Sequence, residues 1–200
     1  MWYDFFIMTI EAENITKIYD GRKVLDGFSL EIKDGVSYLI TGPSGSGKTT
    51  FLNILLGLVK PDEGRIRLLG DYKYPYILAG TVFQEERLCE DHSAVVNVAM
   101  VNRKLSPSFA REELSVLLPA DELDKPVREL SGGMRRRVSI VRAAAVPSDL
   151  LVMDEPFTGL DPVSRQKAIE YIRRKQGDKT LVITSHETDG LEFCRNIPIH

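Results

Sequence analysis

Short apolar runs alternate along the chain with segments in which apolar residues recur at helical spacing. Residues 36–41, 150–153 and 180–184 are each short and largely apolar or β-branched. This is the pattern of parallel strands that are buried on both faces. Residues 48–58 follow the first run with the spacing of a helix. Strands that alternate with helices predict an α/β core with a mainly parallel sheet.

Two further runs have a different pattern. Residues 25–33 and 65–69 are short and alternate apolar with polar positions, and Pro-Asp-Glu-Gly at 61–64 is typical of a turn. We therefore expect an antiparallel β layer beside the parallel core. After position 186 the sequence has room for one helix and a short apolar run at 197–199.

The middle of the chain has a helical pattern. Apolar residues recur at helical spacing from 92 to 118, and prolines punctuate this segment. A second helical stripe consists of Met134, Val138, Val141 and Ala145. The sequence predicts one domain over residues 1–200, with a core at 1–84 and 147–200 and an inserted helical subdomain at 85–146.

A glycine-rich loop follows the first buried run. It consists of Gly42, Pro43, Ser44, Gly45, Ser46, Gly47, Lys48, Thr49 and Thr50. Glycines let successive backbone N–H groups turn inward around phosphate oxygens, a lysine in such a loop reaches the β- and γ-phosphates, and a hydroxyl binds Mg²⁺. The loop predicts a site for a nucleoside triphosphate, with Lys48 on the phosphates and Thr49 on the metal.

Two acids end a second buried run. Asp154 can hold Mg²⁺ directly or through water, and Glu155 can orient the attacking water or accept its proton. The alternative is a solvated loop before Pro156. The apolar strand that leads into the acids favours the catalytic interpretation.

A second glycine-rich turn opens the stripe that begins at Met134. Ser131, Gly132 and Gly133 precede that helix, and a helix N-terminus preceded by glycines is an anion site. A single nucleotide site has no evident need for a second phosphate-binding segment. We therefore expect the loop of one chain and the glycine-rich turn of another to bind the same nucleotide in a dimer.

Six motifs in this order resemble the nucleotide-binding subunit of an ABC transporter, and the resemblance covers nearly the whole chain. Around the glycine-rich loop, the six motifs are Tyr19, Gln84, the signature Leu130 to Gly133, the strand Leu150 to Glu155, the loop Thr158 to Asp161, and His186. The resemblance implies an ATPase with ATP and Mg²⁺ as its ligands. It also implies that two identical subunits enclose two ATP molecules.

The resemblance assigns roles that the residues alone do not. Tyr19 would stack on adenine, Gln84 would touch the metal or the attacking water, His186 would bond the γ-phosphate, and Asp161 would lie in the loop that crosses the dimer interface. Taken singly, these side chains have ordinary alternatives. A tyrosine caps a strand, a glutamine ends one, and a histidine forms a surface or core hydrogen bond.

The signature differs from the commonest family form because Met134 replaces the glutamine that usually follows the two glycines. Met134, residues 83–88 and the short interval from Gly70 to Gln84 resemble the branch that imports nitrate, sulfonates, taurine or thiamine precursors. That branch implies an extracytoplasmic solute-binding protein. Its usual apolar stretch is here the polar segment 89–91, so the groove for the membrane partner is expected to differ. An exporter is the alternative.

The composition of the chain limits the classes of partner that it is expected to bind. The 200 residues carry a net charge of −3, which gives no basic field for nucleic acid. The three arginines 135–137 are explained by a basic helical face beside a triphosphate. No apolar stretch reaches the roughly 18 residues that cross a bilayer. We expect a cytoplasmic subunit, peripheral on the inner face of the cell membrane, that binds integral-membrane transporter subunits through residues 84–100, including Leu88, Val95 and Val98. The alternative for Val95 and Val98 is a place in the core.

Two other classes share part of this pattern. A soluble ABC-type ATPase of DNA repair or translation normally carries a long coiled-coil insertion or a second cassette. A P-loop kinase shares the loop at 42–50 but has no use for the signature or for His186. Both alternatives explain fewer of the motifs.

Overall fold

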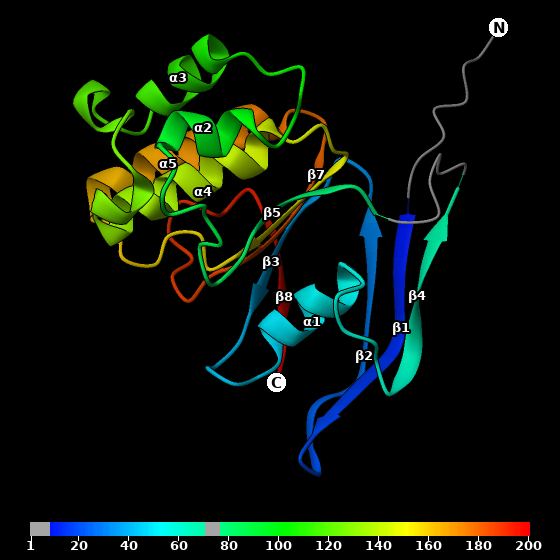
Figure 1. Cartoon of the computed structure of the whole chain (residues 1–200). Coiled ribbons are helices and arrows are strands. Elements are labelled where there is room, and N and C mark those ends of the chain that lie inside the picture. The colour runs from blue at the N-terminus through cyan, green and yellow to red at the C-terminus, as the bar shows by residue number, and fades with distance from the viewer. Residues whose placement is uncertain (1–8, 71–76) are drawn as a thin grey trace, which may run out of the picture.

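A parallel sheet forms the centre of the computed structural model, which describes residues 9–70 and 77–200. Its strand order is β5-β6-β7-β3-β8, and every neighbouring pair is parallel (Figure 1). The strands are β3 (Ser37–Thr41), β5 (Ala79–Val82), β6 (Leu150–Asp154), β7 (Thr180–Thr184) and β8 (Arg195–Pro198). The predicted α/β class with a mainly parallel sheet is confirmed.

Successive residues of the central strands belong to two different cores. Leu151 and Met153 of β6 lie in a hydrophobic cluster with the helices on one face. Leu150 and Val152 lie in a second cluster with α1 (Lys48–Leu55) on the other face. Side chains along a strand point to alternate faces, and both faces are covered here. This is why the strand sequence is apolar throughout.

The expected antiparallel layer is present as a separate sheet with the order β2-β1-β4. Its strands are β1 (Thr9–Tyr19), β2 (Arg22–Lys33) and β4 (Glu63–Leu69). Strand β1 was not predicted from the sequence, although Ile10, Ala12 and Ile15 are buried in it. Phe28 of β2 contacts Phe51 of α1 edge to face at 4.8 Å between ring centroids. This contact joins the layer to the helix that follows the glycine-rich loop.

The remaining helices cover one face of the parallel sheet (Figure 1). They are α2 (Ala94–Ala99), α3 (Pro107–Ser115), α4 (Gly132–Ala145) and α5 (Pro162–Gln176), with short 3₁₀ turns at Ala120–Glu122 and Val127–Glu129. In the stripe predicted for α4, Val138 and Val141 are fully buried, and Met134 and Ala145 pack against the same cluster. No helix within the described residues is long and apolar enough to cross a bilayer.

Several expectations about elements were wrong. Helix α1 ends at Leu55, because Gly57 turns in the left-handed region with φ 70° and the backbone N–H of Leu58 bonds back to Asn53. The described residues after His186 form turns and β8 rather than a helix. Helix α5 was not predicted at all.

Candidate functional site

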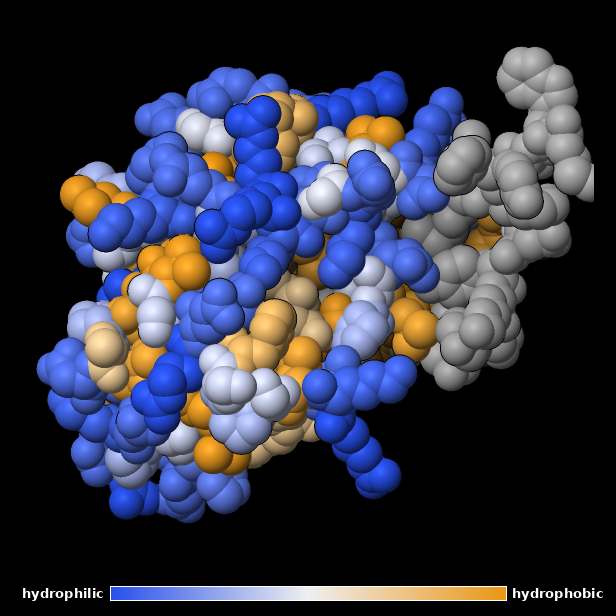
Figure 2. All heavy atoms as spheres, turned by 90° about the horizontal axis from the view of Figure 1, so that it is seen from above, coloured by the Kyte–Doolittle hydropathy of each residue, from blue (hydrophilic) through white to orange (hydrophobic). Residues whose placement is uncertain are grey.

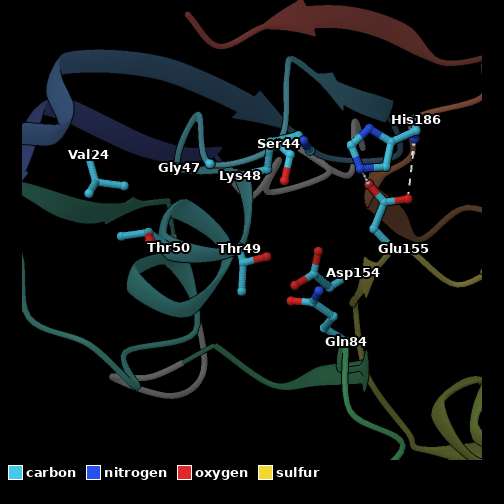
Figure 3. Close-up of a pocket in the computed structure, with 11 residues that line it drawn as sticks. Val24, Ser44, Gly47, Lys48, Thr49, Thr50, Gln84, Asp154, Glu155 and His186 are labelled. Atoms are coloured by element: carbon cyan, nitrogen blue, oxygen red, sulfur yellow. Dashed lines mark hydrogen bonds and ion pairs between the residues drawn. The ribbon is translucent and has the colours of Figure 1, made fainter.

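A polar pocket of about 260 Å³ lies where β3, β5 and β6 end. Parallel sheets place ligands at the carboxyl ends of their strands. The residues that line it are Val24, Ser44, Gly45, Gly47, Lys48, Thr49, Thr50, Gln84, Asp154, Glu155 and His186. The structure therefore brings together residues from four separate motifs, as Figure 3 shows.

Two glycines of the loop, Gly42 and Gly47, are required by close backbone approaches. A Cβ on Gly47, whose φ is 96°, would lie 2.6 Å from the carbonyl oxygen of Val24, and a Cβ on Gly42 would lie 2.3 Å from that of Ile199. Neither position has room for a larger residue. The loop is thus packed between β2 and the residue that follows β8, Ile199, with the N-terminus of α1 facing the pocket.

Lys48 is largely buried beneath this loop. It is 7% exposed, and its Nζ donates to the carbonyl oxygens of Gly42 at 2.8 Å and Pro43 at 3.1 Å. These bonds hold the ammonium group at the mouth of the loop. A positive charge beside the N-terminus of α1 favours an anion there.

The hydroxyl group of Thr184 forms hydrogen bonds with both acidic residues, Asp154 and Glu155. Its hydroxyl donates to Asp154 Oδ1 at 2.7 Å and accepts the backbone N–H of Glu155 at 2.9 Å. Glu155 itself has φ 47°, a conformation that is uncommon for a residue other than glycine. The neighbouring carboxylates are therefore held in different directions. Thr184 was not predicted as a site residue, although its position at the end of the apolar β7 run was a usable signal.

Glu155 faces His186 in the pocket (Figure 3). The backbone N–H of His186 donates to Glu155 Oε2 at 3.2 Å, and His186 Nε2 lies 3.4 Å from Oε1. The glutamate side chain is 13% exposed and the histidine 57%. The carboxylate that was expected to orient water is thus held from the β7 side, within the same pocket.

The oxygens of three side chains suit a magnesium ion. Thr49, Gln84 and Asp154 all line the pocket, and in Figure 3 their polar ends point toward one another. Mg²⁺ prefers hard oxygen ligands and usually takes only one or two protein carboxylates together with substrate phosphates. The 5% exposure of Asp154 beside the phosphate loop fits that arrangement. These residues would hold the metal, which would neutralise developing charge on the phosphates.

Eight of the expected nucleotide contacts do not line this pocket. Three of them, Gly42, Pro43 and Ser46, belong to the glycine-rich loop itself. The other five come from elsewhere in the chain and are Tyr19, Ser131, Gly132, Gly133 and Asp161. Tyr19 ends β1 with 44% exposure and has the Lys17 ammonium 5.3 Å from its ring centroid. Ser131 and Asp161 are exposed N-caps of α4 and α5.

The signature turn and the loop before α5 lie against each other. A Cβ on Gly133 would be 3.1 Å from the carbonyl oxygen of Gly159. Gly133 therefore permits the two segments that were expected at a dimer interface to pack together on one chain. Neither segment reaches the pocket of its own chain.

The arginines of α4 do not form a free basic face. Arg135 pairs with the Glu86 carboxylate at 2.9 Å, Arg136 is only 6% exposed, and Arg137 donates to carbonyl oxygens of Gly133 and Leu117. The explanation of residues 135–137 as a basic face beside a triphosphate was wrong. These guanidinium groups bind the protein's own backbone and Glu86.

Comparisons with known sequences support a nucleotide-binding site in this chain. The family model of the ABC transporter matches residues 25–158. A protein of Cupriavidus metallidurans called Nod factor export ATP-binding protein I is 37% identical over 201 residues, and its namesake in Burkholderia orbicola is 38% identical over 198. The matches cover 94% and 93% of this chain but 66% and 65% of those relatives, so this chain spans just under two thirds of their length.

Solved structures support the same fold. The dimeric post-hydrolysis state of the ATP-binding cassette MJ0796 bound to ADP and Pi has a TM-score of 0.83 and 28% identity, covering 95% of this chain and 94% of that one. A bacterial Atm1-family ABC exporter with ATP bound has a TM-score of 0.82 at 23% identity, over 96% of this chain and 37% of that one, and this supports the fold alone. The matched family, the relatives and the fold together show that the chain belongs to the ABC transporter family, as an ATP-binding domain of that family.

Proposed function

We propose that this chain is the ATP-hydrolysing subunit of an ABC transporter. The observation that carries the proposal is the meeting of Lys48, Asp154 and Glu155 in one pocket at the ends of the central strands. An ammonium group for phosphates, a buried carboxylate for metal and a second carboxylate for water are the parts that phosphoryl transfer to water requires.

The residues divide the reaction between them. The loop N–H groups and Lys48 bind the β- and γ-phosphates of ATP, while Thr49, Gln84 and Asp154 hold Mg²⁺. Glu155 orients a water in line with the γ-phosphorus and takes its proton as the new P–O bond forms. The bond to the β-phosphate oxygen breaks, and ADP and phosphate leave. His186 keeps the Glu155 carboxylate in place and contacts the γ-phosphate.

We also propose that two copies of the chain form the complete site. Ser131, Gly132 and Gly133 would cover the γ-phosphate bound by the partner copy, and Asp161 would cross the interface. The exposure of Ser131 and Asp161 supports this, because neither faces the pocket of its own chain. Tyr19 would stack on the adenine at the outer end of the pocket.

The helical segment 85–146 is proposed to act as a subdomain that moves against the core at 1–84 and 147–200. Its surface would receive integral-membrane subunits on the inner face of the membrane. The expected docking residues need correction: Val95 and Val98 are 5% and 0% exposed and belong to the core. Val96 and Met100, at 41% and 46%, are the exposed apolar side chains on and beside α2. Figure 2 shows hydrophobic residues scattered among hydrophilic ones on this side of the molecule.

The direction of transport is a separate proposal. The relatives named for export, at 37% and 38% identity, favour export. Import of nitrate, sulfonates, taurine or thiamine precursors rests only on Met134, residues 83–88 and the interval from Gly70 to Gln84, and a solute-binding protein is a partner only in that case. The membrane subunits that co-purify with the chain, reconstituted in vesicles, would decide the direction by the side on which solute accumulates.

A phosphate-release assay tests the enzymatic proposal. The purified chain should release phosphate from ATP in the presence of Mg²⁺, and Lys48→Ala should abolish this. Binding of ATP without any Mg²⁺-dependent release, across a range of protein concentrations that permits dimers, would overturn it.

A further inference from the structure

Arg136 lies on α4, the helix that the signature turn opens (below, the signature helix), and donates hydrogen bonds to the backbone of Phe83 and Gln84. Its Nη1 donates to the carbonyl oxygen of Phe83 at 2.7 Å, and its Nη2 donates to that of Gln84, also at 2.7 Å. The guanidinium group therefore spans two consecutive carbonyls, and its planar shape fixes their relative direction. The side chain comes from α4, 52 residues further along the chain than Gln84.

Other side chains of α4 bond the backbone of residues 86 and 87, in the loop that follows β5. Ser139 donates to the carbonyl oxygen of Glu86 at 3.3 Å, and Arg142 donates to those of Glu86 at 3.1 Å and Arg87 at 2.7 Å. These bonds lie beyond Gln84 along the chain. Arg136 alone among these α4 side chains bonds the backbone of Gln84 itself in the described structure.

Burial of the Arg136 guanidinium group costs hydration free energy. Desolvation lowers the pKa of the Arg136 guanidinium, and the charges of Glu86, Asp154 and Glu155 oppose that effect. An apolar side chain of similar length would fill the space without that loss of hydration, but it would leave the carbonyl oxygens of Phe83 and Gln84 without this donor. Packing alone therefore does not account for an arginine at this position, whereas its carbonyl contacts do.

We propose that Arg136 is a positioning residue that aims the Gln84 side chain into the nucleotide pocket and couples it to the signature helix. The proposal rests on the ATPase function proposed above. Because α4 begins directly after Ser131, a displacement of the signature turn moves the same rigid helix that holds the Gln84 carbonyl. Gln84 then reaches the metal or the attacking water only when the signature helix is in its proper place.

A double-mutant cycle in steady-state ATP hydrolysis tests this. Arg136→Met should lower kcat on the order of tenfold or more through misplacement of Gln84, with a much smaller change in KM for ATP, since Lys48 and its loop are untouched. Gln84→Ala should lower kcat as well. Because Arg136 acts through Gln84, the double variant should be no slower than Gln84→Ala, within about twofold.

Arg142→Met is the matched control, since it also removes two guanidinium bonds to carbonyls of this loop. It should lose less kcat than Arg136→Met, and its effect should multiply with that of Gln84→Ala. Arg136→Lys, which keeps the charge and can donate to one carbonyl, should recover part of the activity and replaces Arg136→Met in the cycle if the methionine variant does not fold.

Three results would overturn the proposal: multiplying effects of the Arg136 and Gln84 variants, equal losses from Arg136→Met and Arg142→Met, or a Gln84→Ala variant as active as the wild type. An inactive wild-type chain would instead count against the proposed ATPase. The two failures are thus distinguishable.

Discussion

The Glu155 carboxylate is held by His186 through two contacts, from the backbone N–H at 3.2 Å and from the imidazole Nε2 at 3.4 Å. The two residues follow neighbouring parallel strands, β6 and β7, so the sheet sets their separation. Thr184, two residues before His186, accepts the backbone N–H of Glu155 at 2.9 Å. The end of β7 therefore determines both the backbone and the side-chain position of the proposed water-orienting residue.

Glu155→Gln and Lys48→Ala should affect different steps. Glutamine keeps the shape of the side chain and the oxygen that accepts from His186, but it cannot take a proton, so ATP binding should persist and turnover should nearly vanish. Lys48→Ala removes a charge that binds phosphate before the reaction and should weaken ATP binding itself. Equilibrium binding of a fluorescent ATP analogue and phosphate release would be measured on both variants. Equal losses of binding would contradict this division of roles.

The central part of the fold and site could be read from the sequence because its signals are local. The apolar runs of β6 and β7 are buried on both faces, and the glycines of the phosphate loop sit where only glycine fits. The sequence shows Thr184 at the end of an apolar run, but its two hydrogen bonds could not be predicted, because they depend on which strand lies beside β6. The burial of Arg136 could not be predicted for a similar reason. Three consecutive arginines were interpreted as a basic face beside a triphosphate, and only the fold shows that Arg136 bonds the carbonyl oxygens of Phe83 and Gln84.

The exposed side of α2 was also predicted wrongly. Within that helix Val95 and Val98 face the core while Val96 faces solvent, and six residues are too few for spacing to decide which side is which.

Substitutions in α2 should therefore differ sharply. Val98→Asp places a carboxylate at a fully buried position and should destabilise the chain by about 3 kcal/mol or more. Val96→Asp, at a position 41% exposed, should change stability by no more than about 0.5 kcal/mol. Urea unfolding followed by circular dichroism would measure both. If Val96 contacts a membrane subunit, Val96→Asp should also keep the ATPase activity of the isolated chain and reduce binding of that subunit.

Asp161 should make stability depend on pH. Its Oδ1 accepts the backbone N–H groups of Val163 and Ser164, each at 3.0 Å, and hydrogen bonding to Ser164 holds the pKa of its carboxyl below the usual 3.8. The folded-state pKa is depressed, so the stabilisation is complete above the unfolded value and is lost as pH falls through the folded value. The difference in unfolding free energy between wild type and Asp161→Ala should be largest near neutral pH and shrink below about pH 4.

Asp161→Asn is the control for this titration. Its amide oxygen can still cap α5 but has no proton to gain, so its stability relative to Asp161→Ala should stay level over the same pH range. A difference between wild type and Asp161→Ala that does not change with pH would show that the charged form contributes nothing through this cap.

The composite dimer gives the most decisive prediction, because Ser131 lies outside the pocket that holds Lys48 and Glu155. In the Glu155→Gln chain, ATP should be bound but not cleaved, so two copies that share the nucleotides should remain joined. Light scattering should detect a dimer with ATP and Mg²⁺ and a monomer with ADP. Adding Ser131→Arg should abolish the dimer, since a long cationic side chain would occupy the space where the signature turn meets the γ-phosphate.

Ser106→Arg separates this effect from the loss of a helix cap. Ser131 Oγ accepts the backbone N–H of Met134 at 3.2 Å, and Ser106 Oγ accepts that of Phe109 at 3.1 Å, so each substitution removes one exposed N-cap worth about 1 kcal/mol. Ser106 caps α3, whereas the signature turn opens α4. In the Glu155→Gln background the Ser106 variant should still dimerise with ATP, while the Ser131 variant should bind ATP only as a monomer. Loss of the dimer in both, or persistence in both, would contradict a site completed by the partner's signature turn.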